Sequence, residues 1–513
     1  MTFFWILGVT FRFASYYGDH MVLQKKPAGA VVWGYGEAGA NVTVSLSKDS
    51  KVIMKKMAQV EEHSGTWKVV LAPTDHGGPY SVMAEQEEPK NLTLRDIYFG
   101  DVWLCSGQSN MEMTVSQIIN ASKELSEAPL YPYVRVFTAS LIQSEVELQD
   151  LAKIDLEWSI PTAENLGHGN FSYFSAVCWL FGRHLYETLR YPIGLVESSW
   201  GGSCIESWSS GRVLQECGLT GEATPAVTSP TRGGCSSSCQ FLLPTLLSGP
   251  KMPSVLWNAM IHPLLNMSLT GVIWYQGEAN ALVNTDLYNC TFPALIADWR
   301  RTFHAGSEGQ TQSLFPFGFV QVTGSQGTDH GDRNRCSEPT ADYGYAPNKR
   351  MPNTFMAVAV DLCDEHSPYG SIHPRDKQNV AYRLHLGARA VAYGEKGLVF
   401  QGPYPTKVVV DGARGLINVT YGQELLLLLM HDRIFEVRSM GLSAQEPCQW
   451  VPAPMVSASS HAVTLSSPGC RAAVTRLRYA WAEWPCEYRQ CPLYNKHLLP
   501  APPFVIDSAL RTG

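Results

Sequence analysis

The chain has 513 residues, more than one ordinary hydrophobic core holds, which predicts two to four domains. Apolar residues make up 45% and charged residues 17%, as in globular rather than disordered proteins. The net charge is −7 and there is no basic tract, so we expect neither nucleic acid nor an anionic membrane surface as a partner. The sequence also lacks an apolar run of about 18 residues, so we expect no transmembrane helix.

The first part of the chain, up to about residue 95, has the pattern of a small all-β domain. Residues 1–9 are apolar but short, and we interpret them as the remnant of a signal peptide. Short alternating runs follow at 31–34, 42–46 and 67–71, separated by Gly, Pro and Asn. This pattern predicts an N-terminal β-sandwich domain over residues 10–95.

Residues 96–395 show a different pattern, in which apolar strands alternate with helices. Strands are expected at 97–104, 193–198, 269–275, 317–322 and 355–360, and helices at 111–125, 175–189 and 374–393. Such alternation predicts an α/β domain with a mostly parallel sheet covered on both faces. Chemistry in such sheets tends to lie just beyond the carboxyl ends of the strands.

From residue 396 onward the chain returns to short strands and turns. Strands are expected at 407–410, 416–421, 425–429, 434–437 and 463–465. They predict a C-terminal β-rich domain over residues 396–513. Two further segments, 221–249 and 323–350, are expected to be long loops.

Several features favour the secretory pathway. Asn-x-Ser/Thr sequons, which predict glycosylation, stand at Asn41, Asn91, Asn120, Asn170, Asn266, Asn289 and Asn418. The 13 cysteines are numerous for a cytosolic enzyme and predict disulfides, with at least one thiol left over because the count is odd. Cysteines close in sequence are Cys486 and Cys491, Cys448 and Cys470, and Cys235 and Cys239. We therefore expect a secreted or lysosomal glycoprotein. Because no His or Cys pairs stand at zinc-finger spacing, we expect no metal.

A candidate nucleophile, Ser109, stands where the first strand of the α/β domain ends, in the run Cys105-Ser106-Gly107-Gln108-Ser109-Asn110-Met111. A glycine turn leads into the expected helix, and the N–H groups at a helix N-terminus can stabilise an oxyanion. The run is not the Gly-x-Ser-x-Gly elbow of α/β-hydrolases, so that fold loses support. Judged by position alone, Ser109 fits a helix cap better than a nucleophile.

Three more polar segments follow strands of the same expected sheet. The first is Ser199-Trp200-Gly201-Gly202-Ser203, whose glycines let the backbone approach a ligand. The second, Trp274-Tyr275-Gln276-Gly277-Glu278, contains an amide that can donate to an oxyanion and a carboxylate that can bind a sugar hydroxyl. The third runs from Asp361 to His373. Pro374 fits the first position of a helix, which would put His373 at the helix entrance.

His373 can accept the proton of a serine hydroxyl, and among the other histidines His366 and His262 are its nearest competitors. Each of the four segments is weak when taken separately. Their joint order of serine, glycine pair, amide and histidine, each at a strand end, favours an esterase site.

These segments resemble the SGNH-hydrolase superfamily and, within it, the sialate O-acetylesterases. The resemblance runs from Phe11 to about Phe504 and rests on five blocks, residues 19–24, 100–111, 200–202, 274–278 and 371–377. It implies an SGNH-type, flavodoxin-like three-layer α/β/α domain between the two β-rich domains. It also implies a serine esterase that needs no cofactor, acting on O-acetylated sialic acids or sialoglycans at the 9- or 4-hydroxyl.

The resemblance further implies roles for individual residues. Ser109 would attack the acetyl carbonyl, and His373 would serve as general base and then general acid. The oxyanion would be held by the backbone N–H of Ser109 and of Gly201 or Gly202, together with the side chain of Gln276. Asn110 and Glu278 would contact the substrate.

The sequence departs from the family pattern at the third catalytic residue. Many SGNH enzymes have an Asp three residues before the His, and here that position is Gly370. Asp361 and Asp364 are the nearby candidates, and a Ser–His dyad oriented by a backbone carbonyl is the alternative. Residues 325–338 also lack an Arg-containing stretch that the family resemblance leads us to expect.

Two other functions remain open at the level of sequence. One is an acetylxylan-type or general carbohydrate acetylesterase with the same machinery. The other is a non-catalytic glycan-binding protein, suggested by the missing Asp. The oligomeric state is left open by the sequence.

Overall fold

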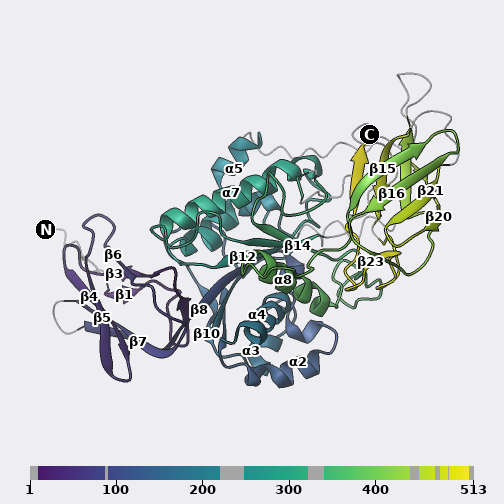
Figure 1. The fold of residues 1–513 in the computed structure, drawn as a ribbon. Helices are drawn as coiled ribbons and strands as arrows, with labels where there is room; N and C mark the ends of the chain where they lie inside the picture. Colours follow the sequence, from purple (N-terminus) through teal and green to yellow (C-terminus); the bar gives the residue numbers. More distant parts are fainter. Residues whose placement is uncertain are drawn as a thin grey trace. The chain divides into compact units, whose positions relative to one another are not determined.

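The structure is a computed structural model that describes residues 10–86, 90–219, 248–321, 340–341, 343–439, 450–467, 474–482 and 484–507 (Figure 1). The chain forms two compact units. The first comprises Met1–Trp274 and Ala294–Phe317, and the second comprises Tyr275–Pro293 and Gly318–Gly513.

The N-terminal part of the first unit is built from two groups of strands. One sheet has the order β1-β3-β6, formed by Arg12–Phe13, Ala30–Tyr35 and Thr66–Leu71. In the other group, β4 (Asn41–Lys48) pairs with β5 (Lys51–Gln59) and with β7 (Gly77–Gln86). Strand β6 alternates buried and partly exposed residues, and Trp33 and Trp67 are fully buried. This alternation is the reason the runs in the sequence could be read as strands.

Strand β8 (Lys90–Gly107) is much longer than the strand expected at 97–104. Its first half pairs antiparallel with β7, and from Asp101 onward it pairs parallel with β11. Its pairing with β7 shifts register between Leu94 and Ile97, and Asp96 has a φ of +55°. The boundary that the sequence pattern suggested at residues 95 and 96 therefore falls inside one continuous strand, which pairs with β7 and with β11 in the same 11-stranded sheet.

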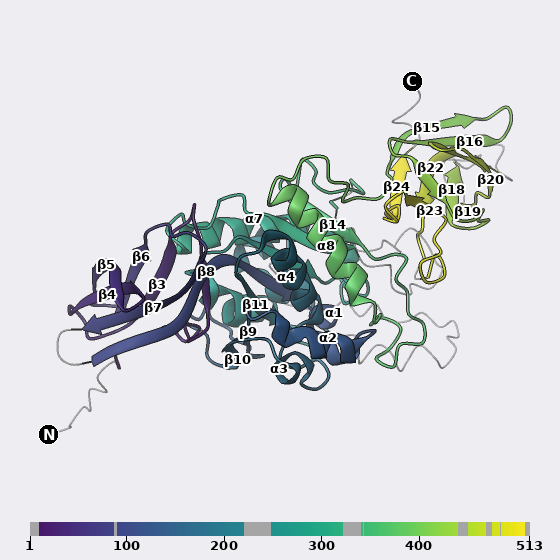
Figure 2. The same ribbon diagram turned by 60° about the horizontal axis from the view of Figure 1, so that its bottom comes forward.

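The central sheet of the first unit has the strand order β10-β9-β11-β8-β12. These strands are Ile154–Ser159, Val134–Ala139, Ile193–Ser199, Lys90–Gly107 and Gly271–Tyr275. The neighbours β9, β11 and β8 run parallel, whereas β10 is antiparallel to β9. Figure 1 shows three helices on one side of this sheet, α2 (Ala121–Glu127), α3 (Ala163–Gly167) and α4 (Ala176–Leu189). Helices α5 (Gly211–Glu216) and α7 (Tyr288–Gly306) lie on the other side, and Figure 2 gives a second view. The sequence analysis missed β9 and β10.

The helices confirm some expectations and correct others. Helix α4 (Ala176–Leu189) begins where the pattern placed it, and the Ser175 hydroxyl caps it by accepting from Cys178 N–H. The continuous helix expected at 111–125 is wrong. Its place is taken by α1 (Ser109–Glu112), a single 3-10 turn at Val115–Gln117, and α2 (Ala121–Glu127). Thr114 has extended dihedrals and pairs with Ser175, which interrupts the helix, and Thr and Val are weak helix formers.

Two more helices differ from expectation. Helix α7 (Tyr288–Gly306) was missed, and it contains Pro293, a residue that argues against a helix interior. Helix α8 (Lys377–Val391) begins after its N-cap Asp376, so Pro374 does not occupy the first helical position. The Asp376 carboxylate accepts from Asn379 N–H, and this cap sets the start of the helix. His373 therefore lies on irregular backbone before the helix.

The second unit combines α8 with β13 (Phe317–Gln321), β14 (Thr354–Val358) and the C-terminal strands. The C-terminal strands form three antiparallel sheets with orders β15-β16-β21-β20, β17-β23 and β19-β18-β22-β24. Their bounds are Pro405–Asp411, Leu416–Tyr421, Ala462–Ser466, Met455–Ala458, Leu425–Leu427, Leu493–Asn495, Val451–Pro452, Phe435–Ser439, Val474–Tyr479 and Phe504–Asp507. A strand was predicted at or next to β15, β16, β17, β18 and β21.

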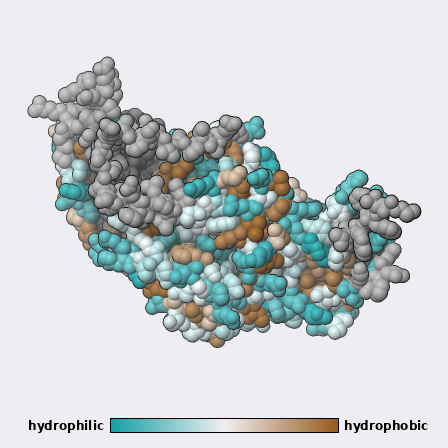
Figure 3. All heavy atoms as spheres, turned by 180° about the vertical axis from the view of Figure 1, so that it is seen from behind, coloured by the Kyte–Doolittle hydropathy of each residue, from teal (hydrophilic) through white to brown (hydrophobic). Residues whose placement is uncertain are grey.

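The described surface mixes polar and apolar residues. On the face shown in Figure 3, hydrophobic residues lie in separate groups among hydrophilic ones. In the part of the chain that is described, none of the helices combines the length and apolar character needed to cross a membrane.

Candidate active site

Ser109 lies directly after the end of β8, half-buried, as the first residue of α1. Gly107 has a φ of +142°, a backbone conformation that favours glycine, and it lets the chain turn out of the strand. Helix α1 has only four residues, so the helix dipole invoked from the sequence contributes little here. The turn, rather than a helix end, places the serine.

The glycine pair lies beside this serine in the first unit. Ser106 and Gly107 of β8 stand opposite Ser198 and Ser199 of β11, so the two parallel strands end at the same level. Trp200 N–H donates to the Gly107 carbonyl at 3.0 Å and joins the two turns. This placement agrees with the expectation that strand ends gather the motifs.

Gly201 packs so closely against the nucleophile turn that a larger residue would collide. A Cβ atom added to Gly201 would lie 2.9 Å from Glu112 Oε2 and 3.3 Å from Ser109 Cβ. The Gly201 N–H donates to Glu112 Oε2 at 2.7 Å. The N–H that the sequence offered as an oxyanion donor is thus engaged by a carboxylate of α1. Gly202, with a φ of +68°, completes the turn.

Two carboxylates lie in this region, Glu197, which is buried, and Glu112, which is partly buried, and neither was singled out from the sequence. Burial raises the pKa of Glu112 to about 7, although the Gly201 hydrogen bond opposes the rise. Burial also raises the pKa of Glu197 on β11 well above its ordinary value, and the negative charge of Glu112 adds to the effect. The Ser199 hydroxyl donates to Glu197 at 2.8 Å, and Ser175 N–H donates to the same carboxylate. A charged residue inside the apolar run 193–199 was the signal that could have revealed Glu197.

In the second unit, the Gln276 side chain is held in one orientation. Its Nε2 donates to Asn280 Oδ1 at 2.7 Å, and its Oε1 accepts from the Tyr288 hydroxyl at 2.8 Å. Gln276 and Glu278 are both buried. These two hydrogen bonds fix which end of the Gln276 side chain carries the oxygen and which the nitrogen.

The orientation of His373 is decided by the backbone. Its Nδ1 lies 2.7 Å from the carbonyl of Tyr369. A carbonyl only accepts, so Nδ1 carries the hydrogen and Nε2 is the basic nitrogen of the neutral ring. Burial lowers the pKa of His373 to about 4, and the positive charge of Lys377 lowers it further, against the effect of the Tyr369 hydrogen bond. The ring is therefore neutral at physiological pH and can accept a proton.

The two aspartates offered as the third catalytic residue are engaged elsewhere. Asp364 is held by the Arg375 side chain, with Nε to Oδ2 at 2.6 Å and Nη2 to Oδ1 at 3.0 Å. Asp361 is fully buried and is held by Arg383 at 2.6 and 2.9 Å and by the Tyr494 hydroxyl at 3.0 Å. The atom that faces His373 Nδ1 is the Tyr369 carbonyl oxygen, the alternative left open by the sequence.

Lys377, part of the histidine block, is the first residue of α8 and is fully buried, four positions after His373. Its ammonium lies 5.0 Å from the centre of the Tyr275 ring, a cation–π contact. Burial lowers the pKa of Lys377 to about 7, while the charges of Glu278 and Asp376 raise it. This cation helps to keep His373 neutral.

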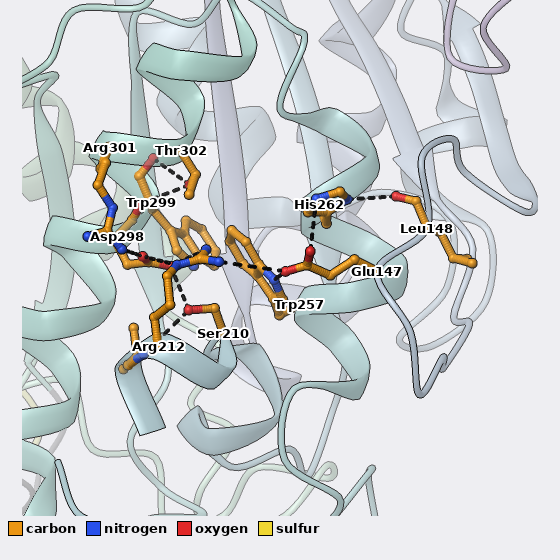
Figure 4. Close-up of polar contacts among 11 residues, drawn as sticks. Glu147, Leu148, Ser210, Arg212, Trp257, His262, Asp298, Trp299, Arg301 and Thr302 are labelled. Atoms are coloured by element: carbon orange, nitrogen blue, oxygen red, sulfur yellow. Dashed lines mark hydrogen bonds and ion pairs between the residues drawn. The ribbon is translucent and has the colours of Figure 1, made fainter. Parts of the chain in front are cut away.

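The competing histidines have other surroundings. His262 lies between two acceptors, with Nδ1 2.8 Å from the Leu148 carbonyl and Nε2 3.4 Å from Glu147 Oε2. Figure 4 shows it within a polar network in which Trp257 donates to Glu147 and Arg212 pairs with Asp298. These contacts fit a structural role. His366 is exposed.

Comparisons with known proteins show the family of this chain. A curated sialate O-acetylesterase of Mus musculus is 57% identical over 98% of this chain and 96% of its own length. The one of Homo sapiens is 56% identical over 97% of this chain and 93% of its own length. The chain belongs to the sialate O-acetylesterase family. Residues 406–508 also match the family model of the sialate O-acetylesterase C-terminal domain.

A solved structure extends the family's similarity to three dimensions. The crystal structure of a carbohydrate acetylesterase from Xanthomonas citri aligns with a TM-score of 0.75 and 28% identity, over 97% of this chain and 100% of that one. The fold is accordingly α/β with several β-sheets, as expected.

The disulfides agree only in part with the pairs that closeness in the sequence suggested. Cys486 pairs with Cys491, as their closeness suggested, but Cys105 pairs with Cys178, which no spacing indicated. Cys235, Cys239, Cys448 and Cys470 lie outside the described residues, as do residues 1–9 and 325–338. Of the sequons, Asn41, Asn91, Asn120, Asn170 and Asn418 are exposed, and Asn266 and Asn289 are partly buried.

Proposed function

We propose that this chain is a serine esterase that hydrolyses O-acetyl esters of sialic acids to acetate and free sialic acid. The observation that carries the proposal is the 56–57% identity to sialate O-acetylesterases over nearly the whole chain. The orientation of His373 supports it, because the hydrogen bond to Tyr369 leaves Nε2 as the basic nitrogen. Its substrates would be 9-O-acetyl and also 4-O-acetyl sialic acids or sialoglycans.

The reaction would proceed through an acetyl-enzyme. Ser109 Oγ attacks the acetyl carbonyl carbon while His373 Nε2 takes the hydroxyl proton. The tetrahedral oxyanion is stabilised by the N–H of Ser109 and by Gln276, with Gly202 a better candidate than Gly201, whose N–H already serves Glu112. His373 returns the proton to the sugar oxygen as the ester bond breaks. Water, deprotonated by the same nitrogen, then releases acetate from Ser109.

We further propose that Ser109 and His373 act as a dyad. The usual aspartate both orients the histidine and stabilises its cation. Here the Tyr369 carbonyl supplies the orientation through an uncharged acceptor. Asn110 and Glu278, both buried, are proposed to contact the substrate.

The fold and the cellular setting complete the proposal. The parallel pairing of β8, β11 and β9 supports an SGNH-type three-layer core at residues 96–395, between β-rich domains at 10–95 and 396–513. The sequons and disulfides support a glycoprotein of the secretory route, secreted or lysosomal.

Ser109→Ala tests the mechanism. We expect acetate release from a 9-O-acetylated sialoside to fall by roughly 1000-fold or more, because the nucleophile is lost. Ser106→Ala is a matched control: Ser106 Oγ is buried on the same strand and makes no hydrogen bond among the described residues. Activity should survive in the control. Undiminished esterase activity in folded Ser109→Ala would overturn the proposal.

The substrate class and the alternatives need a second measurement. Initial rates on 9-O-acetylated sialosides and on acetylated xylan oligosaccharides should favour the sialosides, and the reverse order would indicate a general carbohydrate acetylesterase. The Xanthomonas citri neighbour, named only as a carbohydrate acetylesterase, makes that comparison worthwhile. Fluorophosphonate labelling of Ser109 would exclude a non-catalytic glycan-binding protein, because labelling needs an activated hydroxyl.

A further inference from the structure

A short disulfide-closed loop of the second unit contacts the segment that carries His373. The loop is closed by the bond between Cys486 and Cys491. Within it, the Tyr488 hydroxyl donates to Asp376 Oδ2 at 2.6 Å, and Arg489 N–H donates to the Asp361 carbonyl at 2.7 Å. One loop of six residues thus binds both ends of segment 361–376.

The two residues that the loop contacts, Asp361 and Asp376, are also bound to helix α8. Asp361 is fully buried, and its carboxylate is held by Arg383 from α8. Asp376 is buried too, and it caps α8 by accepting from the backbone and side-chain N–H groups of Asn379 at 3.0 and 2.6 Å. Tyr488 and Arg489 therefore form hydrogen bonds to residues that are themselves bound to α8.

Between these anchors the backbone has neither helix nor strand, only turns. Local hydrogen bonds shape it, from the Ser367 hydroxyl to the His373 carbonyl at 2.7 Å and from His373 N–H to the Gly370 carbonyl at 2.9 Å. Irregular segments of this kind hold a catalytic group only when their ends are fixed by a rigid scaffold. Small displacements of a catalytic group cost large factors in rate.

We propose that the loop Cys486–Cys491 positions His373, with Tyr488 and Arg489 clamping the two ends of segment 361–376. The inference rests on the proposed function, because it assigns the loop a role in the reaction of Ser109 and His373. Tyr488 is a positioning residue in this scheme, since it reaches the reaction only through Asp376 and the histidine segment. The C-terminal β-rich part of the chain would then contribute to catalysis as well as to folding.

Tyr488→Phe is the sharpest test, because it removes one hydroxyl from a side chain that is 43% exposed and leaves the disulfide in place. We expect kcat for a 9-O-acetylated sialoside to fall roughly tenfold with KM little changed. Tyr133→Phe, which removes the hydroxyl of a similarly exposed tyrosine (41%) in the first unit, is the matched control and should leave kcat unchanged.

The pH dependence of fluorophosphonate labelling at Ser109 provides a readout that a merely structural role would not move. A loosened His373 gains water, and since burial is the main cause of its low pKa, the midpoint should rise from about 4 toward 6.5 in Tyr488→Phe. The double variant Cys486→Ser, Cys491→Ser should show the same rise with Tyr488 intact.

The outcomes separate the inference from the proposed function. Loss of labelling in His373→Ala together with wild-type kcat and pH midpoint in Tyr488→Phe would overturn the positioning role alone. Undiminished labelling in His373→Ala would overturn the Ser109–His373 mechanism itself. A lowered kcat and a raised midpoint in both loop variants, with Tyr133→Phe unchanged, is the result we expect.

Discussion

At the scale of single residues, hydrogen bonding and burial set the protonation state of His373, the proposed general base. Its Nδ1 hydrogen is committed to the Tyr369 carbonyl, and burial with the nearby Lys377 charge lowers its pKa to about 4. A general base is active only in its unprotonated form. The same burial that costs free energy for the charged ring keeps the neutral ring available in mildly acidic surroundings.

We therefore predict the acid limb of the rate profile. Above about pH 5 His373 is neutral, so kcat/KM should be flat, and it should fall as pH drops through about 4, where the ring gains its proton. Acetate release measured from about pH 3 to about pH 8 checks this, with samples returned to pH 6 to control for unfolding. A midpoint near the ordinary histidine value of 6.5 would contradict it. Any separate change near pH 7 would point to Glu112 or Lys377, whose pKa values lie at about 7.

At the scale of secondary-structure elements, strand β8, which leads to the proposed nucleophile Ser109, is bonded to helix α4. Cys105 of β8 is bonded to Cys178 of α4, and both are fully buried. Ala176 N–H, in the first turn of α4, donates to the Met113 carbonyl just after α1. Strand β8, the turn that carries Ser109 and helix α4 are consequently connected to one another by a disulfide and a backbone hydrogen bond.

This connection predicts an effect on stability that depends on loop length. The bond between Cys105 and Cys178 spans 73 residues, and that between Cys486 and Cys491 spans five. In the chain-entropy model, removing the longer bridge lowers the free energy of unfolding by about 4 kcal/mol and removing the shorter one by about 2 kcal/mol. Urea unfolding of the two double Cys→Ala variants measures both. An equal or reversed order would show that native packing, rather than the unfolded chain, dominates.

At the scale of the whole molecule, surface chemistry bears on the proposed secretory route. The chain has a net charge of −7, and its exposed sequon asparagines lie on several different elements. Asn266 differs from them, because its Oδ1 accepts from Lys68 Nζ at 3.2 Å. Glycan attachment needs an accessible side chain, so the sequons are not equivalent.

From this we predict the pattern of glycosylation. Secreted from a eukaryotic host, the chain should carry glycans at Asn41, Asn91, Asn120, Asn170 and Asn418. Asn266 and Asn289, which are partly buried, should be occupied less. Peptide mapping before and after enzymatic deglycosylation measures the occupancy of each site. Unmodified asparagine at all the exposed sequons would argue against the secretory route.

The sequence alone was sufficient for features that depend on local pattern. Strand β16 and helix α4 lie where their periodicity placed them, because alternation and amphipathic spacing are local properties. The strand ends also located Ser109 and the glycine pair, since parallel strands end at one edge of a sheet. Family resemblance then supplied the reaction class, which no spacing could.

Only the tertiary structure decided the features that depend on partners distant in the chain. Glu112 accepts a hydrogen bond from the Gly201 N–H, 89 positions away in the sequence. Asp361 and Asp364 form ion pairs with arginines, and the Tyr369 carbonyl orients His373. The cap at Asp376, rather than Pro374, sets where α8 begins. A sequence shows which side chains could form such bonds. Which acceptor each donor binds depends on distances and burial that arise only after the chain has packed.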